Sequence, residues 1–254
     1  MIFETHAHYD DEAFDIDRDS LLEQFPKNGI DYIVNICAEL NSVQKVLDLA
    51  DQYLYVYAAV GIHPSNCGEL NEENFAWVKE MAQHSKSVAI GEIGLDCYWD
   101  TPERQIQKEW FSRQMDLAKE LKLPMVIHSR DAANDTYQMM KEAKADSVGA
   151  IIHCFGYGVE QARQYLNMGF YLGIGGVLTF TNGKKLKEVV EYAPLEQLVL
   201  ETDSPYLAPV PHRGTRNNSN NLTYVAKEIA KIKQVDYDTV LQATYENAKR
   251  FYNI

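Results

Sequence analysis

The sequence predicts a parallel barrel of alternating strands and helices, the α/β TIM (β/α)8 barrel, with an extra C-terminal helix. Eight short apolar runs, rich in β-branched residues, alternate with segments of helical periodicity along the 254 residues. The runs are mainly apolar rather than alternating apolar and polar, which is typical of strands buried on both faces of a parallel sheet. A length of about 250 residues is ordinary for such a barrel.

The predicted elements follow one another without a linker or an internal repeat. The predicted strands are residues 2–4, 32–36, 55–60, 87–90, 125–127, 150–152, 170–174 and 198–200. The predicted helices are residues 20–25, 42–52, 73–83, 102–121, 135–145, 159–168, 184–192, 222–233 and 237–252. In the fourth helix we expect Thr101 as the N-cap and Pro102 at the first helical position.

An open, doubly wound sheet would show a similar alternation. Such a sheet usually has fewer strands, and no G-x-G-x-x-G motif follows the first predicted strand. We therefore expect a single barrel domain over residues 1–254.

Composition limits where the protein works. The chain is 46% hydrophobic, enough for a substantial core, yet no apolar run approaches the roughly 20 residues that a membrane span needs. The N-terminus lacks the basic-then-apolar layout of a signal peptide. The four cysteines are scattered without a C-x-x-C pair, as expected for reduced thiols. The sequence therefore predicts a soluble, cytoplasmic protein, with no membrane and no obligate protein partner.

The formal net charge of −13 excludes one class of function. A protein that grips long duplexes by neutralising phosphates needs a basic face, and this chain has no Lys/Arg-rich block of that kind. A phosphate-bearing substrate would have to be held locally, by metal ions and a few arginines.

Histidines and carboxylates gather where the predicted strands end. His6 and His8 follow the first strand, and their i, i+2 spacing points both imidazoles to one side. Alone, such a pair is more often a chance pair of surface histidines. Four more candidates follow the fourth, fifth, sixth and eighth strands, in that order: Glu92, His128, His153 and Asp203. Because the carboxyl ends of barrel strands share one rim, a metal site becomes the favoured interpretation.

The ligand types indicate the chemistry. Histidines and carboxylates without thiolates suit Zn, Mn, Co or Mg. The first predicted ion has four ligands: His6, His8, Glu92 and Asp203. The second shares the bridging glutamate: Glu92, His128 and His153. Such a bridge can hold two cations ~3.5–4 Å apart, the separation used for displacement at phosphorus. One ion would lower the pKa of a bound water, whose proton Asp203 can accept, so Asp203 and Glu92 are the predicted catalytic residues.

Six segments together resemble a known family. They are residues 5–8 (THAH), 61–64 (GIHP), 91–96 (GEIGLD), 128–130 (HSR), 153–155 (HCF) and 201–207 (ETDSPYL). Their combination resembles the TatD family of metal-dependent deoxyribonucleases, over essentially the whole chain. The resemblance implies an amidohydrolase-like barrel, two or three divalent ions, hydrolysis of DNA phosphodiesters and the ligand roles given above.

The resemblance also implies substrate contacts. His63 would face a substrate phosphate or the water shell of a further metal, and a structural turn before a proline fits equally well. Arg130 and Arg213 can offer charge-assisted hydrogen bonds to phosphate, although Arg130 has the alternative of an ion pair with the aspartate that follows it. Tyr98 and Trp99 could stack on a base, but packing against the barrel rim is the favoured interpretation.

The chain departs from the family pattern in three places. Glu4 stands where the family usually has Asp, and Gly156 replaces the usual Ser. Asn218 and Ser219 replace the expected Glu-Pro, in a run rich in Asn and Ser. We expect this last change to leave the loop less rigid and to affect substrate preference more than chemistry.

The leading functional hypothesis is a metal-dependent deoxyribonuclease that acts on single strands or strand ends of DNA, in an exonucleolytic manner. The same metals and Asp203 could instead hydrolyse another ester or amide, such as an aminoacyl ester on a tRNA end. A metal-binding scaffold without turnover is the third possibility. Asp203 argues against the scaffold, because a scaffold needs no general base.

Overall fold

Eight parallel strands form one sheet in the computed structural model, which describes residues 1–254. Each strand pairs with its neighbours in sequence, in the order β1 to β8. The strands are β1 (Ile2–Ala7), β2 (Ile30–Ile36), β3 (Val56–Ala59), β4 (Ser87–Asp96), β5 (Met125–Arg130), β6 (Ala150–Ile152), β7 (Tyr171–Ile174) and β8 (Leu198–Leu200). The barrel prediction is confirmed, because consecutive parallel strands require a crossover helix between each pair.

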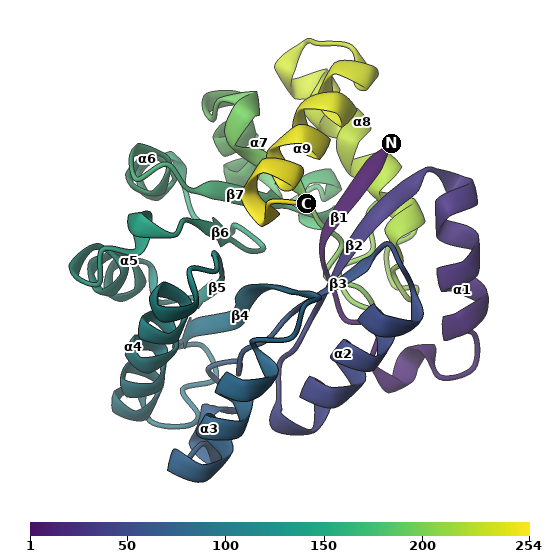
Figure 1. Ribbon diagram of the computed structural model, residues 1–254. Coiled ribbons are helices and arrows are strands. Elements are labelled where there is room, and N and C mark those ends of the chain that lie inside the picture. Colours follow the sequence, from purple (N-terminus) through teal and green to yellow (C-terminus); the bar gives the residue numbers. More distant parts are fainter.

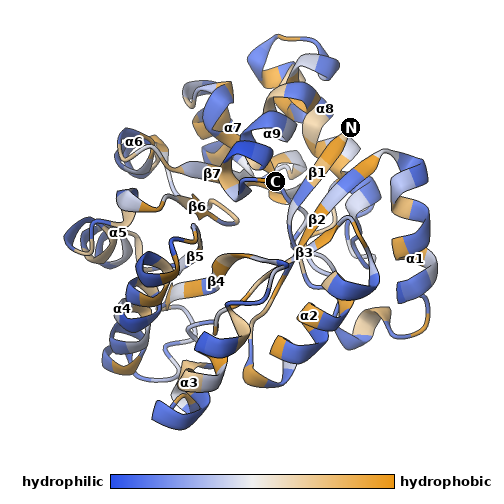
Figure 2. Ribbon diagram, viewed as in Figure 1, coloured by the Kyte–Doolittle hydropathy of each residue, from blue (hydrophilic) through white to orange (hydrophobic).

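Helices form an outer ring around these strands, as Figure 1 shows. They are α1 (Arg18–Gln24), α2 (Val43–Gln52), α3 (Glu72–Met81), α4 (Arg104–Leu121), α5 (Ala133–Glu142), α6 (Val159–Asn167), α7 (Lys184–Tyr192), α8 (Leu222–Lys233) and α9 (Tyr237–Tyr252). In Figure 2 the strands carry many hydrophobic residues, whereas the helices carry hydrophobic and hydrophilic residues together. None of the helices combines the length and the apolar character needed to cross a membrane.

The last strand returns to the first and closes the ring at its carboxyl end. The Asp203 N–H donates to the His6 carbonyl at 2.9 Å, and the His8 N–H donates to the Ser204 carbonyl at 2.8 Å. Lower down, the Thr5 hydroxyl donates to the β8 carbonyl of Leu200 at 2.9 Å. This closure brings the residues after β8 beside the histidines of β1.

The extra helix α9 covers the opposite end of the barrel. Tyr252 stacks on Phe3 with 5.7 Å between ring centroids, and its hydroxyl donates to the Thr5 carbonyl. The Asn247 side chain donates to the carbonyls of Leu195 and Leu198, where β8 begins. The amino ends of the strands are therefore sealed, which leaves the carboxyl ends for a site.

The fourth helix starts later than expected. α4 begins at Arg104 after the N-cap Glu103, so the assignment of Thr101 as the cap and Pro102 as the first helical residue is wrong. The reason is the buried side chain of Gln107, which donates to the carbonyls of Asp96 and Pro102 and holds this segment as a loop. Strands β4 and β5 are also longer than predicted, so Glu92 and His128 lie within them.

Candidate metal centre

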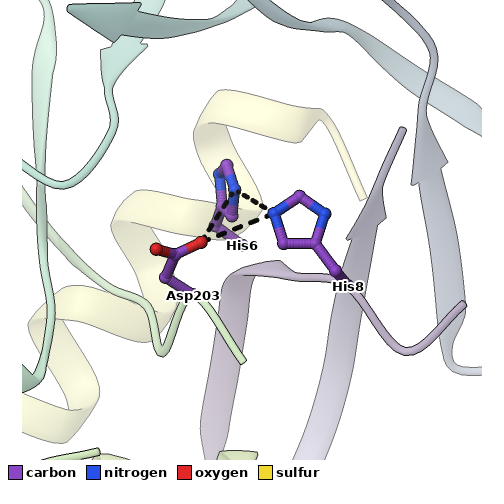
Figure 3. Close-up of side chains that lie close together, drawn as sticks. All are labelled: His6, His8 and Asp203. Carbon is purple, nitrogen blue, oxygen red and sulfur yellow. Dashed lines mark hydrogen bonds and ion pairs between the residues drawn. The ribbon is translucent and has the colours of Figure 1, made fainter. Parts of the chain in front are cut away.

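One group of donor atoms joins the end of β1 to the turn after β8. Figure 3 shows His6, His8 and Asp203 pointing toward one another. The Nε2 atoms of the two histidines lie 3.1 Å apart. Asp203 Oδ1 lies 3.7 Å from His6 Nε2 and 3.4 Å from His8 Nε2. These three atoms face a common point, as ligands of one cation do.

Glu92, in the middle of β4, connects this group to a second one. Its Oε2 lies 3.5 Å from His6 Nε2, while its Oε1 lies 2.8 Å from His128 Nδ1 and 3.7 Å from His153 Nε2. The carboxylate thus turns one oxygen toward each group, which is the geometry that the bridging prediction requires. The His6 and His153 rings also stack at a centroid distance of 3.5 Å, which sets the two groups side by side.

Three of the candidate histidines have their second ring nitrogen held by another group. His8 Nδ1 lies 2.8 Å from the Ile36 carbonyl of β2, and His128 Nε2 lies 3.0 Å from Asp96 Oδ2. His153 Nδ1 lies 3.1 Å from Oε1 of Glu201, a fully buried residue that follows β8. Metal-binding histidines typically have such a carboxylate or carbonyl behind them, because it fixes ring orientation and tautomer.

Three polar atoms in this cluster are buried without a hydrogen bond. They are His6 Nδ1, Glu201 Oε2 and His153 Nδ1, which has only the ion-pair contact with Glu201 Oε1. Next to Glu201, Gly173 of β7 is required for space, because a Cβ there would collide with the Glu201 carboxylate. The fold therefore leaves space for the buried Glu201 carboxylate behind the histidines. Burial of that group costs free energy, which its interactions at the site must offset.

The electrostatics favour ionised carboxylates and added positive charge. Burial raises the pKa of the Glu92 carboxyl, but the charge of His153 and the hydrogen bond from His128 outweigh it and hold this pKa well below its ordinary value. Burial likewise opposes ionisation of Asp203, yet the hydrogen bond from His8 lowers its pKa. Imidazole nitrogens and carboxylate oxygens in this arrangement fit Zn, Mn, Co or Mg.

Of the three remaining predicted substrate contacts, His63 faces donor atoms of the site, whereas Arg130 and Arg213 lie over aromatic rings. His63 faces the second group, with Nε2 4.0 Å from Glu92 Oε1, and its Nδ1 also accepts the Ser65 N–H within the turn. Arg130, the last residue of β5, makes no ion pair with the following aspartate; its guanidinium lies over the Tyr98 ring instead. Arg213 is exposed over Phe180, and no hydrogen bond or ion pair joins it to the other candidates.

Sequence reasoning missed two residues of the cluster, Asp96 and Glu201. Both belong to the segments that carry the family resemblance, but the sequence alone predicts no role for either. A signal for Asp96 existed, because it shares the fourth strand's end with Glu92. Glu201 is two residues from Asp203, and only the structure shows that it reaches the histidine of β6.

A TIM barrel whose carboxyl rim gathers histidines and carboxylates around a shared glutamate belongs to the class of metal-dependent hydrolase barrels. The comparison with family models narrows this class. The model of the family described as TatD related DNase matches residues 3–253, and the chain belongs to that family.

Several relatives are similar over their full length. The chain is 42% identical to the uncharacterized metal-dependent hydrolase YabD of Bacillus subtilis, covering 100% of both chains. It is 34% identical to the uncharacterized metal-dependent hydrolase TatD of Mycobacterium tuberculosis, covering 99% of this chain and 97% of the other. The crystal structure of YjjV, a TatD homolog of Escherichia coli, superposes with a TM-score of 0.93 at 28% identity, covering 100% and 98%.

Proposed function

We propose that the protein is a metal-dependent deoxyribonuclease that hydrolyses phosphodiester bonds in single-stranded DNA or at strand ends. The observation that carries the proposal is the Glu92 carboxylate, which turns Oε2 to His6 and Oε1 to His128. That arrangement suits two neighbouring divalent ions, and a pair of ions is used for in-line displacement at phosphorus. The family description adds support for DNA as the substrate.

Each residue has a distinct part in this proposal. A first ion would be held by His6, His8, Glu92 and Asp203, and a second by Glu92, His128 and His153. Divalent cations bound there would supply Lewis-acid activation of a water molecule and of the scissile phosphodiester. Asp203 accepts the proton of the attacking water, and its lowered pKa keeps it in the basic form.

The charge of the molecule limits the substrate. With a net charge of −13, a long duplex is repelled, whereas a short or unpaired strand can reach the metal centre without lying along the surface. Arg130 is exposed and has no carboxylate partner, so its charge is available to a phosphate. We infer a third site or a phosphate contact beside His63, which faces Glu92 from the loop after β3.

The substitution Asp203→Asn tests the proposal directly. It removes the proton acceptor and weakens a metal ligand. We therefore expect the rate of cleavage of labelled single-stranded DNA to fall about 10²- to 10⁴-fold while the fold persists. The assay uses protein loaded with Mg, Mn, Co or Zn, with and without chelator. The matched control is Asp51→Asn, the same change beside His84 in an exposed pair.

Two results would contradict the proposal. Undiminished DNA cleavage by the Asp203→Asn variant would show that Asp203 is not the base. No cleavage by the unmodified protein with any of the four metals, together with hydrolysis of aminoacyl-tRNA, would replace DNA by an ester substrate at the same centre.

A further inference from the structure

Two aromatic side chains beside the metal centre are exposed to solvent. Tyr98 is 55% exposed and Trp99 is 64% exposed, in the loop between β4 and α4. The expectation that they pack against the barrel rim is therefore wrong. Adjacent exposed rings of this size leave apolar surface in water, which is typical of a binding surface.

The loop that carries the two rings is held by the side chain of Asp96, which also contacts the candidate ligand His128. Asp96 Oδ1 accepts the backbone N–H groups of both Tyr98 and Trp99 at 3.0 Å. The other oxygen of the same carboxylate, Oδ2, lies 3.0 Å from His128 Nε2. One buried carboxylate thus holds the aromatic pair at a set position next to the second group of the metal centre.

The guanidinium group of Arg130, which has no acidic partner, lies over the same two aromatic rings. The Arg130 guanidinium carbon is 3.9 Å from the centroid of the Tyr98 ring and 6.0 Å from that of Trp99. The two rings meet edge to face at 5.0 Å. Because Arg130 has no acidic partner and follows His128 by two residues on β5, its charge can meet a phosphate near the centre.

We propose that Tyr98, Trp99 and Arg130 form a subsite for one unpaired nucleobase and its phosphate, beside the metal centre. This rests on the proposed DNase function and deepens it. Aromatic rings stack on every base, so the subsite is tolerant of sequence. A base in a duplex is already stacked on its neighbours, so the subsite selects single strands and frayed ends.

Cleavage kinetics of the metal-loaded protein test the subsite. The substrates are a thymidine octamer and an abasic octamer of equal length and charge. We expect the unmodified protein to prefer the octamer with bases by about 5- to 150-fold in kcat/KM, mainly through KM. Trp99→Ala should abolish that preference. The matched control is Tyr192→Ala, because Tyr192 is also an exposed ring beside an arginine, Arg163, but lies on α7.

A binding readout accompanies the kinetics. Of the three tryptophans, Trp99 is exposed, Trp77 is partly buried and Trp110 is 7% exposed, so base stacking should quench the emission of Trp99. Quenching of chelator-treated protein by the thymidine octamer, absent with the abasic octamer and absent in Trp99→Phe, is the expected result. Equal kcat/KM for the two octamers, or a preference that survives Trp99→Ala, would overturn the subsite while leaving the DNase function intact. No cleavage of either octamer with any metal would overturn both.

Discussion

The fully buried Glu201 controls the candidate ligand His153 from behind. Its Oε1 lies 3.1 Å from His153 Nδ1 and also accepts the Cys154 N–H at 2.6 Å. Gly173 on the neighbouring strand has no side chain, and this absence makes room for the carboxylate. Asp96 has the same relation to His128, so the second group is oriented by two acids that are not themselves proposed ligands.

The change Glu201→Gln should weaken binding at the second group by about 10- to 100-fold, because the negative charge that orients the His153 ring is lost. Calorimetric titration of the metal-free protein with Mn or Zn measures this. Gly173→Ala should act in the same direction by displacing the carboxylate. The exposed Glu196 provides the control Glu196→Gln, and an affinity of Glu201→Gln equal to that control would show that Glu201 does not act on the ligand.

Metal binding should release protons at pH 7. Burial lowers the pKa of His8, but the hydrogen bond and charge of Asp203 raise it to about 9. Burial opposes protonation of His153 too, and the charges of Glu201 and Glu92 raise its pKa to about 10. Both imidazoles must be neutral to bind a cation, so affinity should rise with pH until both pKa values are passed. Calorimetry in two buffers of different ionisation enthalpy should detect about two released protons, and no buffer dependence would contradict the expectation.

At the scale of elements, the loop between β8 and α8 is better anchored than its composition suggests. Asn217 donates to the carbonyls of Thr202 and Tyr206, and the buried Ser219 hydroxyl donates to Glu4 Oε2 at 2.9 Å. These contacts hold the loop in place, and its rigidity relative to the family pattern stays a prediction. Two of the three departures from the family pattern are partners, because Glu4 on β1 accepts the hydrogen bond that Ser219 offers.

This partnership should be measurable as coupling between the two positions. Ser219→Ala removes one of the two hydroxyl donors of the buried Glu4 Oε2 and leaves only that of Thr202, which should cost about 0.5–1.5 kcal/mol of unfolding free energy. A double-mutant cycle of Ser219→Ala and Glu4→Gln, followed by urea unfolding, should give a coupling of about 0.5–3 kcal/mol. The exposed Ser147 supplies the control Ser147→Ala, which should change stability by less than about 0.5 kcal/mol. Strict additivity would show that the contact carries no energy.

At the scale of the whole molecule, the barrel collects side chains from β1, β4, β5, β6 and the turn after β8 at one rim. Several acids gather there in a chain whose net charge is −13. Cations bound at that rim would neutralise carboxylates that the fold brings together. Metal should therefore stabilise the entire barrel, because the ligands come from strands that span most of the chain.

Removal of metal with a chelator should abolish hydrolysis and lower the melting temperature. A ligand present at 100 times its Kd contributes about 2.7 kcal/mol to the folded state. Differential scanning calorimetry with chelator, and again after Mn or Zn is restored, measures the change. Restored metal should return both activity and melting temperature, and a melting temperature indifferent to metal would mean that no cation is held by the folded barrel.

Much of the fold could be predicted because apolar runs and helical periodicity are local properties. All eight strands occur where the apolar runs lie, and the helices follow them. The ends of elements were predicted less well. α4 begins at Arg104 because the Gln107 side chain bonds backbone carbonyls that lie before the helix, and that contact leaves no local pattern.

The sequence by itself determined the kind of site, because His6, Glu92, His128, His153 and Asp203 follow the apolar runs of their strands, and any parallel barrel brings those positions toward one rim. The tertiary structure alone decided which atom faces which: the two oxygens of Glu92 turned to different histidines, Glu201 behind His153, and Trp99 left in solvent. The physical reason is that side-chain spacing along a strand follows from the chain itself, whereas contacts between strands depend on register and on the space left by neighbours such as Gly173.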